Sequence, residues 1–422
     1  MRALLALLLL VWLPAQAHDG YPRLFGMQIG DKHYDDPAYQ RQLARLDIAI
    51  LGFYRGWGED GGAMRAVVRR LKQLNPHMLV GQYTILNEAS ARPDNDAEHD
   101  KQQALREHGW WLQDAAGRRV QWTAQYDAWD INITRWSQPD AHGRRYPEWL
   151  AARDHRVYFA PVPEFDIWYF DNVMSHPRIA AADWKRSGSD QSGTDRDIQR
   201  AFRRAQAAHW RAARKLAPHM LFIGNPDNDL SYPEYRQRLQ GAFLEGLIGE
   251  EWSLYAQHGW DAMMERYHAV FAHLAPPRIV AFHAIGAADD YRLLRFALGS
   301  ALMDDGYFSY TDRARGYSSV PWFDEYDADL GRPRDPPQRK PWQDGVYRRR
   351  FEHGMVLVNP TDAPRRVVLE PGYRHLRGTQ DARINNGRPA HRITLGARDA
   401  VLLLACAECA RALSRSEPEK GT

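Results

Sequence analysis

The sequence predicts an α/β protein, a (β/α)8 TIM barrel followed by a small C-terminal all-β sandwich domain. Eight short apolar runs alternate with stretches of helical periodicity, which is the pattern that a barrel of parallel strands requires. After residue 312 the pattern changes to short strands separated by turn residues. The 422 residues are enough for one large domain and one small one.

The eight predicted strands are apolar segments of the length expected for buried parallel strands. They comprise residues 24–30, 48–54, 78–84, 167–173, 220–225, 242–247, 278–285 and 306–310. Helices are predicted at 37–46, 63–74, 195–216, 259–274 and 291–302. The third connection, from 86 to 165, is far longer than the others, and connections of that length are usually functional.

The long connection also carries most of a dense tryptophan cluster. The chain has 15 Trp and 20 Tyr, and the cluster comprises Trp110, Trp111, Trp122, Trp129, Trp136, Trp149 and Trp168. A tryptophan ring presents a flat apolar face and a polar edge, which suits stacking on a sugar ring. We therefore expect this connection to form a wall of a binding cleft. Half or more of these rings, Trp168 and Trp210 among them, are expected to fill the core instead.

Three segments are predicted outside the barrel, which spans 18–340. Residues 341–405 form the sandwich, with strands at 345–351, 354–359, 366–369, 393–395 and 400–404, and residues 406–422 form a disordered tail. Cys406 and Cys409, the two cysteines of the chain, are interpreted as an incidental pair open to oxidation. Residues 1–17 resemble a secretory signal peptide: Arg2, an apolar stretch 3–13 too short to span a bilayer, and Ala-Gln-Ala at 15–17.

Export and charge limit the partners. Cleavage after Ala17 places the mature protein in the periplasm or outside the cell, and no later segment is apolar enough to cross a membrane. The formal charge of +3 becomes +2 when Arg2 is removed, so nucleic acid is not an expected partner. The oligomeric state is not predicted.

Two carboxylates occupy the ends of predicted strands four and six. Asp171 ends the apolar run that begins at Ile167, and Glu245 ends the run that begins at Ala242. Catalytic groups of barrel enzymes lie at the carboxyl ends of strands, and a carboxylate buried there is costly unless it is paired or used. A pair of carboxylates facing each other across a barrel is what glycoside hydrolysis requires.

Alternative roles remain open for these residues. Asp171 could cap the turn that follows it, and Glu245 could be a salt-bridged structural carboxylate. Glu250, Glu251 and Asp227 are rivals for the proton donor. Retention or inversion depends on a separation that the sequence does not give. Ten further residues at strand ends or on the long connection are predicted to bind substrate: Tyr54, Gln82, Asn87, Trp129, Asn172, Asn225, Asp227, Glu251, His283 and Tyr310.

Other chemistries lack their motifs. The chain has no phosphate-binding Gly-rich loop and no nucleophile elbow, and its 17 His show no metal-binding spacing. Asp304 with Asp305, or Asp94 with Asp96, could bind a cation, but acidic surface turns are more common. We predict no metal and no cofactor, which disfavours a metal-dependent deacetylase or hydrolase.

Several segments resemble the hypothetical glycosyl hydrolase family fifteen. They are FDIWYFDN at 165–172, GAFLEG at 241–246, GYFSY at 306–310, WFDEYDADLG at 322–331 and GVYRRRFEHGMVLVNP at 345–360. The resemblance implies a (β/α)8 barrel with a C-terminal β domain, and a more distant similarity to α-galactosidase and α-galactosaminidase barrels. It matches Asp171 to the nucleophile and Glu245 to the proton donor, where some of those enzymes have Asp. It implies a reaction class and no particular substrate.

The sequence thus predicts a secreted or periplasmic glycoside hydrolase that cleaves O-glycosidic bonds of a polysaccharide, such as a bacterial exopolysaccharide. The alternative is a catalytically inactive polysaccharide-binding barrel that keeps the tryptophan wall. A second buried carboxylate favours the enzyme, because binding alone does not need it.

Overall fold

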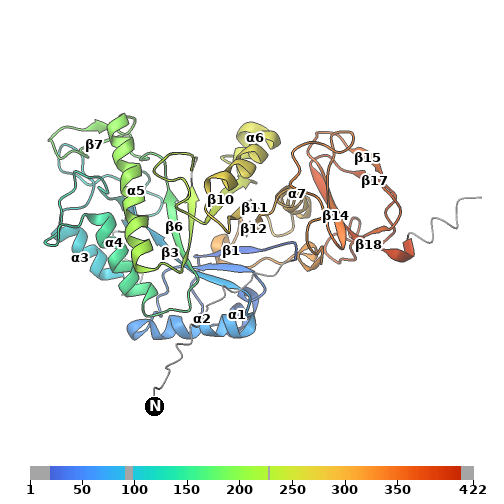
Figure 1. The fold of residues 1–422 in the computed structure, drawn as a ribbon, viewed down its shortest axis with the longest axis horizontal. Helices are drawn as coiled ribbons and strands as arrows, with labels where there is room; N and C mark the ends of the chain where they lie inside the picture. The colour runs from blue at the N-terminus through green and yellow to red at the C-terminus, as the bar shows by residue number, and fades with distance from the viewer. Residues whose placement is uncertain (1–19, 91–97, 227–228, 410–422) are drawn as a thin grey trace, which may run out of the picture.

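The computed structural model describes residues 20–90, 98–226 and 229–409. At its centre lies a sheet of eight parallel strands (Figure 1). In sheet order these are β1 (Phe25–Gln28), β2 (Ile48–Leu51), β3 (Leu79–Ile85), β6 (Ile167–Val173), β9 (Leu221–Pro226), β10 (Gly241–Ile248), β11 (Ile279–Gly286) and β12 (Tyr307–Asp312). A parallel bridge between Leu24 and Phe308 brings the two edges together. All eight predicted strands are confirmed, and the sheet is a nearly closed TIM barrel.

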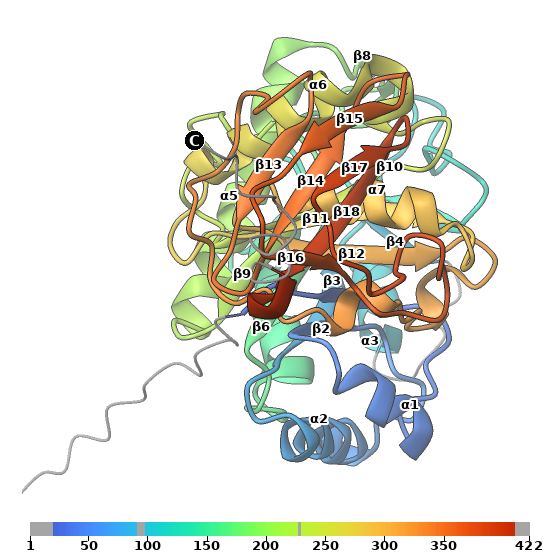
Figure 2. The same ribbon diagram turned by 90° about the vertical axis from the view of Figure 1, so that its right-hand side faces the viewer.

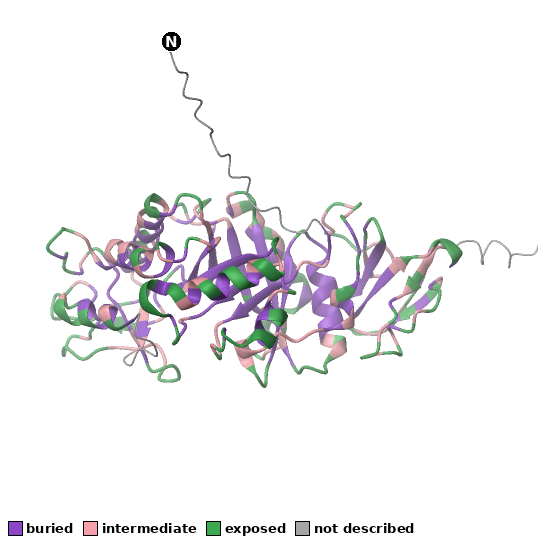
Figure 3. Cartoon of the chain, turned by 90° about the horizontal axis from the view of Figure 1, so that it is seen from below, coloured by how far each residue is buried: buried purple, intermediate pink, exposed green. Residues whose placement is uncertain are grey.

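The strands alternate between an inner and an outer core. Residues such as Ile167, Tyr169 and Ile223 fill the barrel interior, whereas Trp168 and Phe170 pack outward. The outer core meets the five predicted helices, which are α1 (Pro37–Leu43), α2 (Gly62–Leu74), α5 (Arg196–Leu216), α6 (Leu254–Val270) and α7 (Tyr291–Ala301). Figure 3 shows these layers, with buried strands inside and exposed residues on the outward faces of the helices.

Local signals explain where several of these helices begin. Asp36, Asp195 and Asp290 each accept a hydrogen bond from a backbone N–H of the first turn, and Ser253 does the same for α6. Such capping satisfies donors that have no partner inside a helix. Between β9 and β10 the described residues 229–240 form turns and no helix, so this barrel departs from the regular alternation there.

The long connection after β3 forms a small layer of its own. It contains β4 (Glu88–Ser90), α3 (His99–Glu107), β5 (Ala128–Asp130), α4 (Tyr146–Asp154) and a short π-helix, η3 (His155–Phe159). Trp110, Trp111 and Tyr146 are buried in its core, which also takes in Phe202 of α5. Figure 1 shows this layer beside α5, at the opposite end of the molecule from the C-terminal strands. Trp110 and Trp111 are thus part of a core, whereas the other tryptophans of the connection, Trp122, Trp129, Trp136 and Trp149, are half-buried, and Trp168 and Trp210 are buried as expected.

The C-terminal segment forms two antiparallel sheets (Figure 2). One has the order β13 (Tyr347–Arg350), β14 (Gly354–Asn359), β18 (Asp399–Ala405) and β16 (Tyr373–His375), and the other pairs β15 (Arg365–Val368) with β17 (Arg392–Leu395). Residues of both sheets share one hydrophobic core. The five predicted strands are confirmed, and β16 was not predicted.

The C-terminal sheets are fixed to the barrel through α7. Arg295 of this helix pairs with Asp399 of β18 at 3.0 Å and with Asp381 at 2.7 Å. A side chain at Gly299 would collide with Ala400, so glycine permits close packing at this contact. These contacts orient the C-terminal sheets against the outer layer of the barrel.

The chain ends are described only in part. The predicted signal peptide, 1–17, and most of the predicted tail, 410–422, lie outside the described residues. Cys406 and Cys409 form a disulfide. No helix of the described part of the chain is long and apolar enough to cross a membrane.

Candidate active site

Three inward-facing side chains meet at the carboxyl end of the barrel. Asp171 continues the inner face of β6 after Tyr169, Asn225 continues β9 after Ile223, and Glu245 continues β10 after Phe243. Because β6 and β10 flank β9 in the sheet, the ends of the three strands lie side by side. The strands therefore deliver two carboxylates and one carboxamide to the same place.

Asn225 joins the two carboxylates. Its Nδ2 donates to Asp171 Oδ1 at 3.0 Å and to Glu245 Oε2 at 2.7 Å. Two oxygens that bind one nitrogen at these distances cannot be more than ~5.7 Å apart. Retaining glycosidases hold their carboxyl groups about 5–5.5 Å apart, whereas inverting enzymes need about 6.5–9.5 Å to admit a water. The geometry fits direct attack by one carboxylate.

Two tyrosines complete the hydrogen bonding of the pair. Tyr83 of β3 donates from its hydroxyl to Asp171 Oδ2 at 2.6 Å, and Tyr317 donates to Glu245 Oε1. Tyr317 lies in a short 3-10 turn after β12, η5 (Gly316–Ser318). Burial and the neighbouring carboxylate raise the pKa of both phenols well above the ordinary value, so they remain donors. The described hydrogen bonds run unbroken from Tyr83 to Tyr317.

Irregular backbone follows each carboxylate. Asn172 has φ of 51° and Gly246 has φ of 58°, and the strand register shifts at both places. A β-bulge of this kind re-aims the side chains beside it. The positive φ at 246 favours glycine, and the absence of a Cβ also lets the Trp252 ring approach, since a Cβ there would lie 2.1 Å from it.

His283 holds the backbone behind Glu245. The N–H of Gly246 donates to His283 Nδ1 at 3.0 Å, so this ring nitrogen is an acceptor. The other ring nitrogen, Nε2, then carries the proton and donates to Thr311 Oγ1 at 2.8 Å. Burial lowers the pKa of His283 to about 3, which keeps the ring neutral. His283 is therefore a positioning residue for the turn after Glu245.

The two carboxylates differ in their electrostatic setting. The Glu245 side chain is exposed to solvent, but the groups packed around its carboxyl group displace water from it and raise its pKa, and the negative charge of Asp171 raises the pKa further, against the opposing hydrogen bonds from Tyr317 and Asn225. A carboxyl group whose pKa is raised keeps its proton at higher pH and is suited to act as an acid. The arrangement can thus supply one carboxylate as a nucleophile and one carboxyl group as a proton donor.

The β4–β5 ribbon adds a second acidic pair beside this cluster. Glu88 lies directly opposite Asp130. Glu88 accepts from Trp122 Nε1 at 2.6 Å and from Asn172 Nδ2 at 3.2 Å. The Arg178 guanidinium lies 4.2 Å from the Trp122 ring centre and donates to Asn172 Oδ1. Glu88, Trp122 and Arg178 thus form a wall that joins the long connection to the bulge after Asp171.

Burial and like charge make the wall sensitive to pH. Burial, and then the charge of Glu88, raises the pKa of Asp130 to about 7. Because the folded-state pKa lies above the unfolded value near 4, the stability that Asp130 contributes is complete below about pH 4 and is lost as the pH rises to about 7.

Replacing Asp130 with Asn should therefore stabilise the protein at high pH. The amide oxygen can still accept from the Trp122 backbone N–H, as Asp130 Oδ2 does at 3.1 Å. We expect Asp130→Asn to raise Tm by about 2–4 °C at pH 8 and by less at pH 5, measured by differential scanning calorimetry. An equal gain at both pH values would show that charge is not the cause.

Four predicted binding residues point away from the cluster, three of them because they face the other side of their strands. Gln82 and Tyr310 point outward, where Gln82 donates to Gly52 and Tyr310 to Ala287. Tyr54 packs on Tyr34 in the outer core, with ring centres 5.3 Å apart. Trp129 is paired with Ala89 and lies on the face of the ribbon opposite to Glu88, against the core of the long connection.

Among the described residues, the other predicted positions form no hydrogen bond with the carboxylate pair. Glu250 pairs with Arg313 at 2.8 Å, and Glu251 is exposed on the loop after β10. Asn87 is buried beside Glu88. Asp227 lies outside the described residues, as do Asp94 and Asp96. Asp171, Asn172, Asn225, Glu245 and His283 are the predicted residues that the structure brings together.

The part of the chain that the structure describes contains no group of three or more His, Cys, Asp or Glu placed to hold a metal ion. Asp304, considered above for a cation, instead bonds His268 at 2.7 Å and Arg339 at 2.9 Å.

Comparison with solved structures supports the barrel architecture. An α-amylase from Lactobacillus plantarum is 12% identical with a TM-score of 0.54, over 90% of this chain and 98% of that one. The glycoside hydrolase domain of PelA from Pseudomonas aeruginosa is 14% identical with a TM-score of 0.43, over 72% of this chain and 98% of that one. At these identities the α-amylase shows a shared fold alone.

Comparison of the sequence gives the family. No curated protein matches the chain. The family described as hypothetical glycosyl hydrolase family 15 matches residues 72–355, about two thirds of the chain, and the matched region contains Tyr83, Asp171, Asn225, Glu245 and Tyr317. The chain is a glycoside hydrolase and belongs to the hypothetical glycosyl hydrolase family 15.

Proposed function

We propose that the protein is an exported glycosidase that hydrolyses a polysaccharide with retention of configuration. Asp171 is the nucleophile and Glu245 is the acid and base. The observation that carries this proposal is the bridge by Asn225, which holds the two carboxylates within the separation of retaining enzymes. The raised pKa of Glu245 supports the assignment of the proton donor.

The first step forms a bond to the protein. An Asp171 oxygen attacks the anomeric carbon, the glycosidic C–O bond breaks, and Glu245 gives its proton to the departing oxygen. The hydrogen bonds from Tyr83 and Asn225 fix the orientation of the attacking carboxylate. Glu245 is left as a carboxylate, which Tyr317 and Asn225 stabilise.

The second step releases the sugar. Glu245 takes a proton from water while the water oxygen attacks the anomeric carbon, and the bond to Asp171 breaks. Asp171 returns as a carboxylate and Glu245 as an acid, so the cycle closes without a cofactor. Asn172 and the wall of Glu88, Trp122 and Arg178 lie where sugar hydroxyls would be held.

The function is tested with the purified mature protein and a panel of polysaccharides. Release of reducing ends from at least one polymer is expected, and Asp171→Asn should remove it. If polymers bind but none is cleaved, the protein is the catalytically inactive binding barrel instead.

The pH profile should respond to Tyr317. The alkaline limb of kcat/KM reports loss of the Glu245 proton. Tyr317→Phe removes a hydrogen bond that favours the charged form, so the pKa of Glu245 should rise and the alkaline limb should move to higher pH. The rate at the optimum should fall by no more than about tenfold. If the alkaline limb does not move, Tyr317 does not influence the pKa of the catalytic acid.

We infer export from the first 17 residues, and the mature N-terminus should be His18. Mass spectrometry of the protein from the periplasm or the medium checks this. Intact Met1 on cell-associated protein would contradict it.

We also infer that the two C-terminal sheets face each other as a sandwich that supports the barrel. Their shared core and the contacts of α7 with Asp399 and Asp381 favour this arrangement. A crystal structure with the two sheets edge to edge would overturn it.

A further inference from the structure

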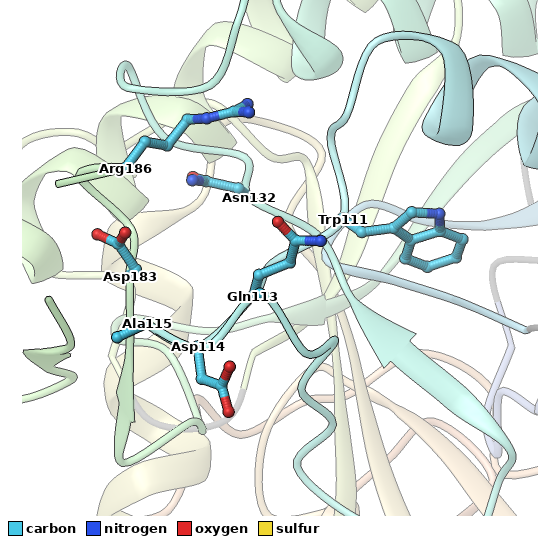
Figure 4. Close-up of a pocket in the computed structure, with 8 residues that line it drawn as sticks. Trp111, Gln113, Asp114, Ala115, Asn132, Asp183 and Arg186 are labelled. Carbon is cyan, nitrogen blue, oxygen red and sulfur yellow. The ribbon is translucent and has the colours of Figure 1, made fainter. Parts of the chain in front are cut away.

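A trough lies on the surface between the long connection and residues 183–186 of the segment after β6, and none of its lining residues belongs to the catalytic cluster. Two adjoining hollows of about 230 and about 430 Å³ share Trp111, Gln113 and Gly117. The first hollow is also lined by Asn132, Asp183 and Arg186, and the second by Gln102, Arg106 and Arg119. Figure 4 shows the first hollow, with Arg186, Asn132 and Asp183 on one side and Gln113 and Trp111 on the other.

Three arginines make the trough basic. In the described ranges, no ion pair involves Arg106, Arg119 or Arg186. The trough also contains two acidic residues, of which one is paired with a cation and the other keeps its negative charge but is engaged by backbone N–H groups. Asp114 pairs with Arg118 at 2.7 Å. Asp183 accepts hydrogen bonds from the backbone N–H groups of Ser187 and Gly188, each at 2.8 Å. The side chains that remain available are therefore cationic guanidinium groups.

Two of the arginines are held in place without pairing with a carboxylate. The Arg119 guanidinium carbon lies 5.1 Å from the Trp111 ring centre and 5.3 Å from that of Trp129. Arg186 Nη1 donates to the Gly109 carbonyl at 3.1 Å. A guanidinium fixed in this way loses little freedom on binding and matches a carboxylate or sulfate with paired hydrogen bonds.

The amides around the arginines suit hydroxyl groups. The Gln113 side chain is exposed, and Asn132 uses Nδ2 to donate once, to Trp184 at 2.9 Å. Gly117 leaves the shared part of the two hollows open, since nothing lies within 4 Å of the position of its absent Cβ. The trough thus combines guanidinium groups, amides and an indole in an elongated space.

The trough is built on the same small sheet as the wall of the active site. Gln113 and Arg119 form a backbone bridge, so their side chains share one face. Asp130 of the wall is bonded through its backbone to Leu112 and Val120, at 3.0 Å in both cases. A polymer bound in the trough would be held by the element that also carries Glu88 and Trp122.

We propose that this trough is a second, non-catalytic binding site for a segment of an anionic polysaccharide that carries carboxylate or sulfate groups. This proposal rests on the proposed function in one respect, namely that the polymer is a polysaccharide. The charge of the trough gives the anionic character, and its amides give the affinity for hydroxyls.

The test measures binding without turnover. The full mature chain carrying Asp171→Asn is run by affinity electrophoresis in gels with polygalacturonate, dextran sulfate, neutral dextran or single-stranded DNA. Retardation is expected in at least one of the two acidic polysaccharides, weaker in DNA, and absent in dextran. Arg106→Ala with Arg186→Ala should weaken this binding at least about tenfold, since two charge-assisted contacts are lost. Arg119→Ala is examined separately, because it also removes packing between two tryptophans.

Matched controls keep the result interpretable. Arg70→Ala removes an equally exposed arginine from α2, remote from the trough, and should leave retardation unchanged. When Asp171 is left unchanged, the variant with both Arg106→Ala and Arg186→Ala should keep the wild-type rate on a small aryl glycoside. Retention of wild-type binding by that variant would overturn the proposal, as would equal binding of dextran or of DNA. Because binding is measured in the Asp171→Asn background, failure of the glycosidase assignment would leave this result unaffected.

Discussion

Replacing Asp171 with Asn is expected to abolish turnover while leaving binding of the polysaccharide. The amide has the size and shape of the carboxylate, so Tyr83 and Asn225 still surround it, but it has no negative charge with which to attack carbon. Loss of a covalent nucleophile lowers kcat by roughly 10⁴- to 10⁶-fold. The rate is measured by reducing-end release, and binding by isothermal titration calorimetry.

Asp312→Asn is a matched control for this change. Asp312 is a buried carboxylate at the end of β12, and its Oδ1 accepts from the Ala314 backbone N–H, which an amide oxygen can also do. The control should keep activity within about threefold and a similar Tm. Full activity in Asp171→Asn would exclude Asp171 as the nucleophile.

Replacing Glu245 with Gln is expected to impair turnover in a way that depends on the leaving group. A sugar hydroxyl needs a proton to depart, so the rate of cleavage of a bond between two sugars should fall by about 10²–10⁴-fold. An aryl leaving group departs without a proton, so the first step should be nearly normal for aryl glycosides. Steady-state rates for the two kinds of substrate are compared.

Azide provides a further readout of the same residue. In Glu245→Ala, azide can attack the glycosyl–Asp171 bond without help from a base, so it should restore the rate on an aryl glycoside. Glu251→Gln is the matched control, since Glu251 is an exposed glutamate on the loop after β10, is not bonded to Asp171 or Glu245 in the structure, and should behave as wild type. Equal losses for good and poor leaving groups would move the acid role to Asp227, Glu250 or Glu251.

The barrel could be predicted because its strands are buried on both faces and therefore appear as apolar runs. Asp171 and Glu245 could be found because each interrupts such a run at its carboxyl end. Both lie two residues beyond an inner core residue, Tyr169 or Phe243. The strand pleat then turns them inward.

The errors within strands follow from the same pleat. The sequence predicts Gln82 as a binding residue, whereas its neighbour Tyr83 faces inward, and the predicted Tyr310 lies beside the inward-facing Thr311, which bonds His283. An error of one residue moves a side chain to the opposite face of the sheet. Counting in twos from the inner residues would have selected Tyr83.

The remaining site residues could not be predicted from the sequence in this way. Tyr317 reaches Glu245 from a turn 72 residues along the chain, and Trp122 reaches Glu88 from 34 residues away. Loops place such side chains through tertiary packing, which has no periodic signal. Composition also does not distinguish a stacking surface from a second core, so the sequence does not tell which tryptophans of the cluster are buried, as Trp110 is, and which are half-buried, as Trp122 is.

The anomeric configuration of the first product tests the two-carboxylate mechanism most directly. The polymer cleaved in the panel is digested in an NMR tube, and the anomeric ¹H signal is recorded before mutarotation. A double displacement through Asp171 predicts that the new reducing end first appears with the configuration of the bond that was cleaved. First appearance of the opposite anomer would show that water attacks directly, and would contradict the role of Asp171 as a nucleophile.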